Sequence, residues 1–264
     1  MAAVETALGR ARAAGRPTLV TYVTGGIRAD WTDLLGAMID AGADAVEIGL
    51  PFSDPMLDGH TIQQASDAAL RRGATPAAIL AELAQLGAAA RRVPLIAMAY
   101  ANHAYRHGLG GYCRRLADAG ISGSIIPDLP VAEAGGYLDA ARTAGLDATL
   151  MVTPATPEND IHAIAARTHG FLYVMSVMAT TGTTNQSADT ERWAVAARAR
   201  RRSPQPVLIG FGIDTPDRAA AAARHADGVI VASALMRRVL DGASSADIGR
   251  DVARLRAAVD PARR

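Results

Sequence analysis

The feature that most constrains this 264-residue chain is a regular alternation of short apolar runs with longer amphipathic segments. The runs recur roughly every 25 to 35 residues, and they are β-branched or almost entirely apolar, as is typical of strands buried on both faces of a parallel sheet. We expect eight strands, at 18–23, 45–50, 94–100, 123–128, 148–152, 171–177, 206–211 and 228–232.

The segments between these runs have the periodicity and start signals of helices. One apolar stripe with helical spacing is formed by Trp31, Leu34, Leu35, Met38 and Ile39. Asp30 stands at the N-cap position of that helix, and Thr75-Pro76 and Thr215-Pro216 each combine a capping hydroxyl with proline at the first helical position.

Eight strands, each followed by a helix, predict an α/β protein of the (β/α)8 (TIM) barrel class. The alternative is a doubly wound open sheet, which manages with fewer strands, and the glycine fingerprint of a dinucleotide site is missing after the first run. We expect one barrel domain over 1–264, an extra N-terminal helix at 4–15, an added helix after the second strand at 61–72, and a further helix at 246–259.

Composition narrows the environment and the partners. The 27 basic and 26 acidic residues leave a net charge of +1, which favours neither nucleic acid nor an anionic membrane as a partner. The one cysteine, Cys113, reads as a buried structural thiol, and the start of the chain lacks the apolar run of a signal peptide. We therefore expect a cytoplasmic protein.

The chain contains no lysine, because all 27 basic residues are arginine. A Schiff base with a carbonyl substrate, a pyridoxal phosphate anchor and a Walker-type phosphate clamp each need a lysine amine. Those three chemistries are excluded for this chain's own side chains.

Candidate acid–base groups gather where the second strand ends. Glu47 lies inside the apolar run 45–50, and a buried carboxylate there needs either a task or an arginine partner. The loop that follows brings Asp54, Asp58 and His60 to the same end of the barrel. Two carboxyls in contrasting environments suit acid–base catalysis without a metal. Asp54 and Asp58 could equally be turn residues, chosen for conformation alone.

A lysine-free phosphate site is expected where the last strands end. Glycine-bearing turns follow two strands at 181–182 and 210–212, and Ala232-Ser233 lead into a helix. Backbone amides in such turns, together with a helix N-terminus, bind anions. In barrels of this class the same corner is a recurrent phosphate site.

A metal site is the competing interpretation. His103 and His107 are spaced i, i+4 and His60 lies in the preceding loop, so the three could hold zinc for a metal-dependent aldolase. No acidic residue lies between His103 and His107, and YANHAYRHG (100–108) has the character of an exposed loop, which speaks against this site.

Five segments in order along the chain share one pattern: ADAVEIGLPFSDPMLDGHTIQ, IIPDLPVAEA, FLYVMSV followed by TTG, IGFGI and DGVIVASAL. In this order, and over nearly the whole chain, they resemble the tryptophan synthase alpha subunit family. The resemblance implies cleavage of indole-3-glycerol phosphate to indole and glyceraldehyde 3-phosphate, without a cofactor. It also implies transfer of the indole to a pyridoxal-phosphate β subunit.

The resemblance assigns roles to particular positions. The acid–base glutamate falls on Glu47, and the aspartate that accepts the indole N–H falls on Asp58. Substrate-pocket positions fall on Tyr22, Tyr100, Tyr173, Thr181 and Phe211. Phosphate-binding positions fall on Gly182, Gly212, Ala232 and Ser233.

The chain departs from the family's usual pattern in its loops. Gly-Asp-Pro after the first strand is replaced at 26–28, Leu57 and His60 stand for an alanine and a proline, and Ala232 stands for a glycine. Arg-x-Gly-Val-Thr-Gly is altered at 177–182. We hypothesise that the retro-aldol reaction is retained while coupling to a β subunit is altered, so that the enzyme supplies free indole. The rivals are a metal-dependent aldolase or epimerase on another sugar phosphate, and a non-catalytic barrel that regulates a partner.

Overall fold

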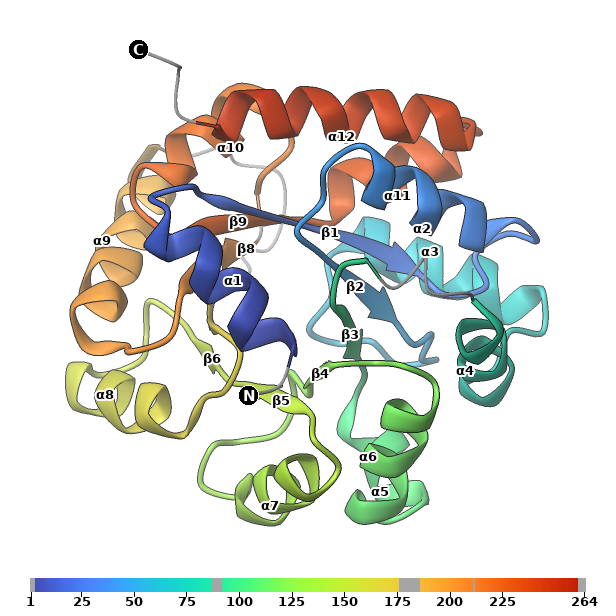
Figure 1. Cartoon of the computed structure of the whole chain (residues 1–264), viewed down its shortest axis with the longest axis horizontal. Helices are drawn as coiled ribbons and strands as arrows, with labels where there is room; N and C mark the ends of the chain where they lie inside the picture. Colours follow the sequence, from blue (N-terminus) through green and yellow to red (C-terminus); the bar gives the residue numbers. More distant parts are fainter. Residues whose placement is uncertain (1–2, 87–91, 176–185, 211, 261–264) are drawn as a thin grey trace.

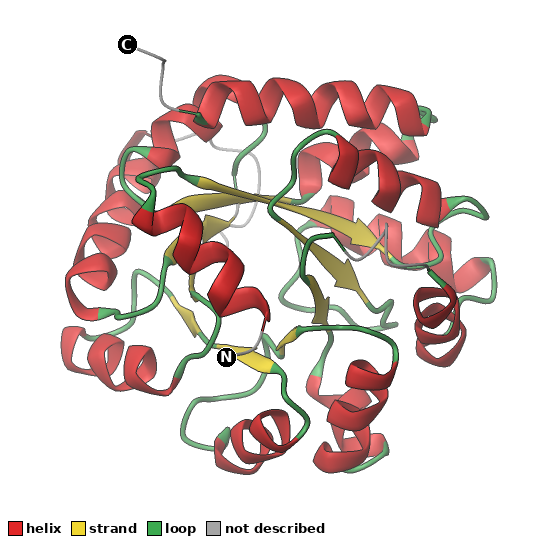
Figure 2. Ribbon diagram, viewed as in Figure 1, coloured by secondary structure: helices red, strands yellow, loops and turns green. Residues whose placement is uncertain are grey.

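In a computed structural model of the chain, a ring of parallel strands is surrounded by helices (Figures 1 and 2). The structure describes residues 3–86, 92–175, 186–210 and 212–260. Within these ranges nine strands form one sheet in the order β5-β4-β3-β2-β1-β9-β8-β7-β6, and every pairing is parallel. The predicted (β/α)8 barrel is confirmed.

The nine strands correspond to the eight predicted runs. They are β1 (Thr18–Thr24), β2 (Ala45–Gly49), β3 (Leu95–Met98), β4 (Gly123–Ile125), β5 (Asp147–Thr149), β6 (Met151–Val152), β7 (Leu172–Val174), β8 (Val207–Gly210) and β9 (Gly228–Val231). The predicted run 148–152 is divided at Leu150 into β5 and β6. β5 pairs with β4 and β6 pairs with β7, so this one segment closes the ring.

Twelve helices are described, and the three additional helices predicted from the sequence are among them. These three are α1 (Ala3–Ala13), α3 (His60–Arg71) and α12 (Ser245–Val259). The others are α2 (Trp31–Asp40), α4 (Pro76–Gln85), α5 (Ala101–Arg106), α6 (Leu109–Asp118), α7 (Gly135–Thr143), α8 (Glu158–Arg167), α9 (Gln186–Arg202), α10 (Pro216–Ala223) and α11 (Ser233–Leu240). Within the described ranges, no helix combines the length and apolarity required to cross a membrane.

Two of the three helix caps behave as predicted. Thr75 and Thr215 each accept a hydrogen bond from the backbone N–H three residues on, and proline follows both. Asp30 precedes α2 but makes no side-chain capping bond. Its carboxylate instead accepts two hydrogen bonds from Arg28, a residue of the loop that departs from the family pattern.

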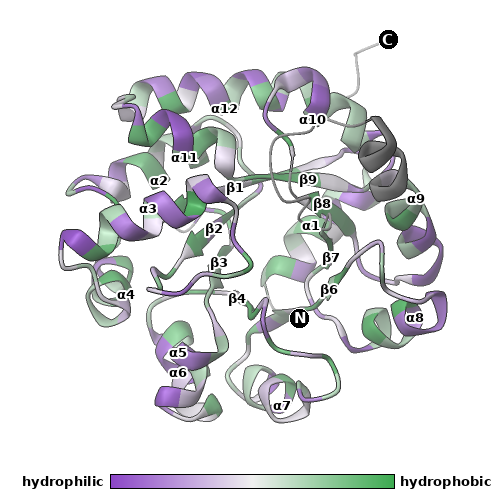
Figure 3. Cartoon of the chain, turned by 180° about the vertical axis from the view of Figure 1, so that it is seen from behind, coloured by the Kyte–Doolittle hydropathy of each residue, from purple (hydrophilic) through white to green (hydrophobic). Residues whose placement is uncertain are grey.

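The apolar core has two layers because successive strand residues point to opposite faces. Side chains such as Leu19 and Val46 face the helices, and the helices present their apolar faces to the strands while polar residues cover the outside (Figure 3). A second cluster fills the inside of the ring and includes Val20, Ala45 and Ile96. Helix α1 crosses one end of the ring in Figure 1 and packs its Val4 and Leu8 into this inner cluster.

Candidate active site

A cavity of about 80 Å³ lies at the carboxyl ends of the strands, the end of the barrel opposite α1. It is lined by Tyr22, Glu47, Asp58, Gly59, Ile62, Met98, Tyr173, Gly212, Ile213, Ile230, Ala232 and Ser233. These residues come from five strands (β1, β2, β3, β7 and β9) and from the loops and helices after them. Both candidate carboxyls and three of the candidate phosphate-binding residues therefore face one space.

Glu47 points into the barrel because it has the same pleat parity in β2 as Ala45, which belongs to the inner cluster. Its strand neighbour in register is Tyr22 of β1. Glu47 is 1% exposed, and its Oε1 has no hydrogen-bond partner within the described residues. Burial, reinforced by the nearby Asp58 carboxylate, raises the pKa of Glu47 to about 8. The carboxyl is thus mainly protonated at neutral pH.

Asp58 reaches the same cavity from the loop between β2 and α3. Its backbone N–H donates to the carbonyl of Pro55, which folds the loop back over the barrel end. Burial raises the pKa of Asp58 to about 6, and a hydrogen bond from the Tyr100 hydroxyl partly offsets this rise. At neutral pH Asp58 is mainly ionised, so the two carboxyls differ in protonation state although they line one cavity.

Tyr100 holds the loop that carries Asp58. Its hydroxyl accepts a hydrogen bond of 3.0 Å from the backbone N–H of Leu57 and donates to the Asp58 carboxylate. Phe52 stacks on the Tyr100 ring with 5.1 Å between ring centroids. The family resemblance places Tyr100 in the substrate pocket, but Tyr100 is not among the described residues that line the cavity. It contacts the cavity residue Asp58 through its hydroxyl.

Tyr22 and Tyr173 form aromatic walls of the cavity, and each depends on a glycine in the adjacent strand. A Cβ at Gly49 would lie 1.8 Å from the Tyr22 hydroxyl oxygen, and a Cβ at Gly210 would lie 2.1 Å from that of Tyr173. Both separations are far inside van der Waals contact, so a larger residue at either glycine would displace the tyrosine. Burial raises the pKa of both phenols, which remain neutral donors.

Gly212, Ala232 and Ser233, which the family resemblance assigns to phosphate, lie together at one side of the cavity. Gly212 adopts a φ of 69°, which favours glycine, and Ser233 is the first residue of α11. Ala232, which stands for the family's glycine, is the N-cap of that helix with a φ of −115°. Alanine is therefore unstrained there, and its amide remains available.

The structure leaves some predicted residues apart from the cavity. Asp54 is exposed and hydrogen-bonds to Ser53, as its interpretation as a turn residue implies. His60 is exposed at the start of α3. Thr181, Gly182 and Phe211 lie outside the described residues.

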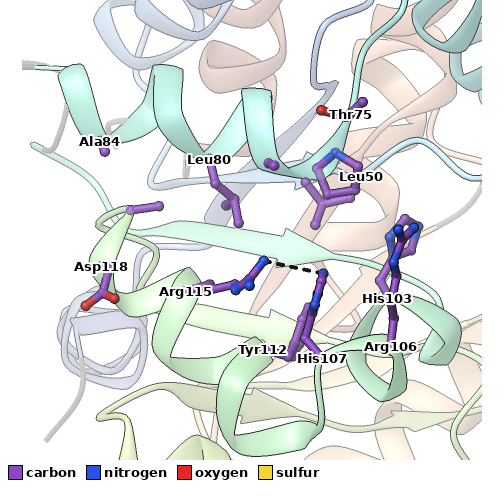
Figure 4. A pocket seen from close by; sticks show the side chains of 13 residues that line it. Leu50, Thr75, Leu80, Ala84, His103, Arg106, His107, Tyr112, Arg115 and Asp118 are labelled. Atoms are coloured by element: carbon purple, nitrogen blue, oxygen red, sulfur yellow. Dashed lines mark hydrogen bonds between the residues drawn. The ribbon is translucent and has the colours of Figure 1, made fainter.

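The three histidines of the zinc interpretation do not meet. Within the described part of the chain, no three histidine, cysteine or acidic side chains gather in a way that could hold a metal ion. His103 and His107 line a separate cleft on the outside of the barrel (Figure 4). Cys113 is buried, and burial raises the pKa of its thiol to about 11.

Sequence reasoning missed several residues that shape the cavity. Ile62, Met98, Ile213 and Ile230 supply its apolar lining. Met98 lies two residues after Ile96 of the inner cluster, and Ile230 belongs to that cluster itself, so strand parity could have identified both as inward-facing. The supporting roles of Gly49 and Gly210 required the cross-strand register, which the sequence does not contain.

Comparison with known proteins agrees with this geometry. A family model described as "Tryptophan synthase alpha chain" matches residues 8–261. A tryptophan synthase alpha chain from Dehalococcoides mccartyi is 38% identical over 93% of this chain and 96% of its own length. The one from Roseiflexus castenholzii is 41% identical over 89% and 91%.

Solved structures give the same result. A structure of Mycobacterium tuberculosis tryptophan synthase superimposes with a TM-score of 0.89 at 31% identity, covering 98% of this chain and 99% of that one. The tryptophan synthase subunit alpha of Legionella pneumophila gives 0.88 at 28% identity, with 98% of both chains covered. The chain belongs to the tryptophan synthase alpha chain family.

Proposed function

We propose that this protein is a carbon–carbon lyase that cleaves indole-3-glycerol phosphate to indole and glyceraldehyde 3-phosphate. The observation that supports this most directly is the pair of buried carboxyls in one cavity, with a pKa of about 8 for Glu47 and about 6 for Asp58. At neutral pH one of them can donate a proton while the other accepts one, and this reaction needs both.

The first half of the reaction converts the indole ring into an electron acceptor. Glu47 donates its proton to C3 of the ring, and the N1 proton passes to the Asp58 carboxylate. The product is an indolenine with a C2=N1 double bond, still joined through C3 to the glycerol chain. Since the ring nitrogen accepts the electrons, the step needs no amine from lysine.

The second half breaks the C–C bond and restores both carboxyls. The ionised Glu47 removes the proton from the hydroxyl next to the bond, and the oxygen forms the aldehyde carbonyl. The bonding electrons move into the ring as C2=C3, and N1 takes its proton back from Asp58. Each carboxyl ends the cycle in its starting protonation state.

The residues at the two ends of the cavity match the two ends of the substrate in their chemistry. Tyr22, Tyr173 and Ile62 provide flat and apolar contacts for an indole ring, and Gly212 with the N-terminus of α11 provides amides for a phosphate. We assign the phosphate to Gly212, Ala232 and Ser233, with Gly182 as a fourth contributor from the family resemblance.

The decisive experiment is incubation of the purified chain with indole-3-glycerol phosphate, with indole measured as the product. Replacing Glu47 with Gln should lower kcat by about 10²- to 10⁴-fold, because the proton donor is lost. Binding of glycerol phosphate, which contacts only the phosphate end, should stay within about twofold. Unchanged turnover in Glu47→Gln would refute the assignment.

We also propose that the reaction runs without a β subunit and that coupling to one is altered. In the loop after β1, Arg28 donates to the carbonyl of Ala243 at 2.7 Å and thereby fastens this loop to the segment before α12. Turnover by the chain alone should lie within about tenfold of turnover with a tryptophan synthase β subunit added. A rise of about a hundredfold on adding the β subunit would contradict altered coupling. A cytoplasmic location belongs to the same proposal, and cell fractionation tests it.

A further inference from the structure

A large cavity lies outside the barrel, between α4 on one side and α5 with α6 on the other (Figure 4). Its volume of about 660 Å³ is within the range of small-molecule sites. It shares no lining residue with the cavity that contains Glu47 and Asp58. The reaction proposed above for the Glu47 and Asp58 cavity therefore gives this second cavity no role. We refer to it as the outer cleft.

The two walls of the outer cleft differ in chemistry. The α4 wall is apolar and is made by Ala77, Leu80 and Ala84, and Leu50 extends it at the end of β2. The facing wall carries Arg106, His107 and Arg115. Figure 4 shows Leu80 above and Arg115 and His107 below, with the cleft between them.

The basic groups on that wall are not neutralised by the protein. The Arg115 guanidinium donates a hydrogen bond of 3.4 Å to Nε2 of His107, so its partner in this bond is another basic side chain and brings no negative charge. Among the residues that the structure describes, neither Arg106 nor Arg115 forms an ion pair with a carboxylate. Asp118 is the single acid in the lining, and in Figure 4 it lies at the far end, away from His107 and Arg106.

His103 adds a hydrogen-bonding group without a partner. It lines the cleft, and its ring hydrogen-bonds to the backbone of Pro51. Its Nε2 is buried and has no partner within the described ranges. A buried polar nitrogen normally has one, so this end of the wall lacks a complementary group, and the one acid of the lining, Asp118, lies away from it.

We propose that the outer cleft is a second ligand site, for a small carboxylate attached to an apolar group. The planar guanidinium of Arg115 matches a carboxylate in a two-bond arrangement, and His107 lies next to it. The apolar part of the ligand would lie against Leu80 and Ala77. A purely polar anion would leave that wall exposed to water, which is why the ligand class includes an apolar body.

Benzoate is the probe that tests this proposal, by isothermal titration of the full chain. We expect saturable binding with a Kd on the order of 1 mM, as a ligand of this size can reach. Replacing Arg115 with Gln should weaken binding by about tenfold, and Leu80→Glu, which places a negative charge on the opposite wall, should weaken it at least as much. The matched control is Arg114→Gln, since Arg114 is exposed on the same helix and does not line the cleft; its affinity should stay within about twofold.

Two further ligands separate charge from apolar contact. Benzamide has the same shape without the charge and should bind about tenfold more weakly than benzoate, and inorganic phosphate should not displace benzoate at equal concentration. Crystals soaked in 4-bromobenzoate should show bromine near Leu80. The proposal is overturned by absence of saturable benzoate binding up to about 20 mM, or by an affinity that Arg115→Gln leaves unchanged. Equal binding of benzamide, or equal competition by phosphate, would overturn the ligand class.

Discussion

At the scale of single residues, the cavity depends on keeping two similar side chains in different protonation states. Glu47 is buried against the inner wall of the barrel, whereas Asp58 lies in a loop where the Tyr100 hydroxyl can reach it. Desolvation is the larger effect for both, and the hydrogen bond from Tyr100 moderates it for Asp58 alone. The tyrosine behind the loop therefore contributes to the difference between the two pKa values.

The pH dependence of kcat/KM should be bell-shaped. Activity should fall below about pH 6, where Asp58 becomes protonated, and above about pH 8, where Glu47 loses its proton. Tyr100→Phe should move the acidic limb to higher pH, because it removes the hydrogen bond that lowers the pKa of Asp58. Tyr105→Phe, at an exposed position of the same segment, is the control. An acidic limb that does not move in Tyr100→Phe would disprove this role.

Glu47 should also reduce the stability of the folded chain at alkaline pH. The folded chain retains this proton up to about pH 8, whereas the unfolded chain releases it near 4.5, so stability declines as pH rises between those values. Glu47→Gln should raise the free energy of unfolding in urea by about 1 to 3 kcal/mol at pH 8, and by much less at pH 4.5. Glu133→Gln, at an exposed position, should change it at neither pH. A gain of the same size at both pH values would contradict the ionisation argument.

At the scale of elements, β1 and β7 can place Tyr22 and Tyr173 in the cavity wall only because the adjacent strands have glycine beside each ring. Gly49 ends β2 and Gly210 ends β8, and each lies beside a tyrosine of the next strand in the ring. The required small residue and the tyrosine that needs it are far apart in the sequence. Register between strands thus determines the shape of the cavity.

Gly49→Ala should displace Tyr22 and lower both stability and turnover. A new Cβ only 1.8 Å from the hydroxyl cannot be accommodated without movement, and overpacking of this kind costs about 1 to 3 kcal/mol. Gly36→Ala in α2 is the matched control, because a Cβ there meets nothing within 4 Å. It should stabilise the chain by about 0.5 to 1 kcal/mol. Urea denaturation of both variants, with indole release measured beside it, checks the contrast.

Elements that could be predicted from the sequence are stabilised by groups close to them in the chain, whereas an element that could not be predicted is stabilised by a distant residue. The strands were predictable because burial on both faces makes each a continuous apolar run, and Thr75 and Thr215 cap their helices through local bonds. α5 was expected to be an exposed loop, and this was wrong. Its first amide donates to the carboxylate of Asp128 at 2.8 Å, a partner 27 residues away. Local patterns cannot show such a cap.

At the scale of the whole molecule, α1 and the strands form one packed interior. Leu8 is completely buried and lies in the same inner cluster as Val20, Ile96 and Leu208. Because α1 covers the other end of the barrel, the polar residues of the cavity lie at the carboxyl ends of the strands. Sequence patterns predicted α1 and placed Glu47 and Asp58 at one end of the barrel, where both line one cavity. The outer cleft depends on how α4 and α6 pack and had no signal in the sequence.

Leu8→Ala should therefore destabilise the entire barrel. Loss of a fully buried leucine side chain typically costs about 2 to 5 kcal/mol, and here the void would open at the end of the inner core. Arg10→Ala on the exposed face of the same helix should stay within about 0.5 kcal/mol. Equal urea midpoints for the Leu8 variant and the unmodified chain would mean that α1 is not part of the core.

The interruption at Leu150 decides where the ring of strands is weakest. β5 contributes three paired residues and β6 only two, whereas β1 and β2 are paired over five. In the order of the sheet, β1 and β2 lie opposite this joint. Local opening of the strand pairing should be most frequent at residues 147–152, so the amide hydrogens there should exchange first among those of the strands. Glu47 lies in β2, which is on the side of the barrel where such opening should be rarest.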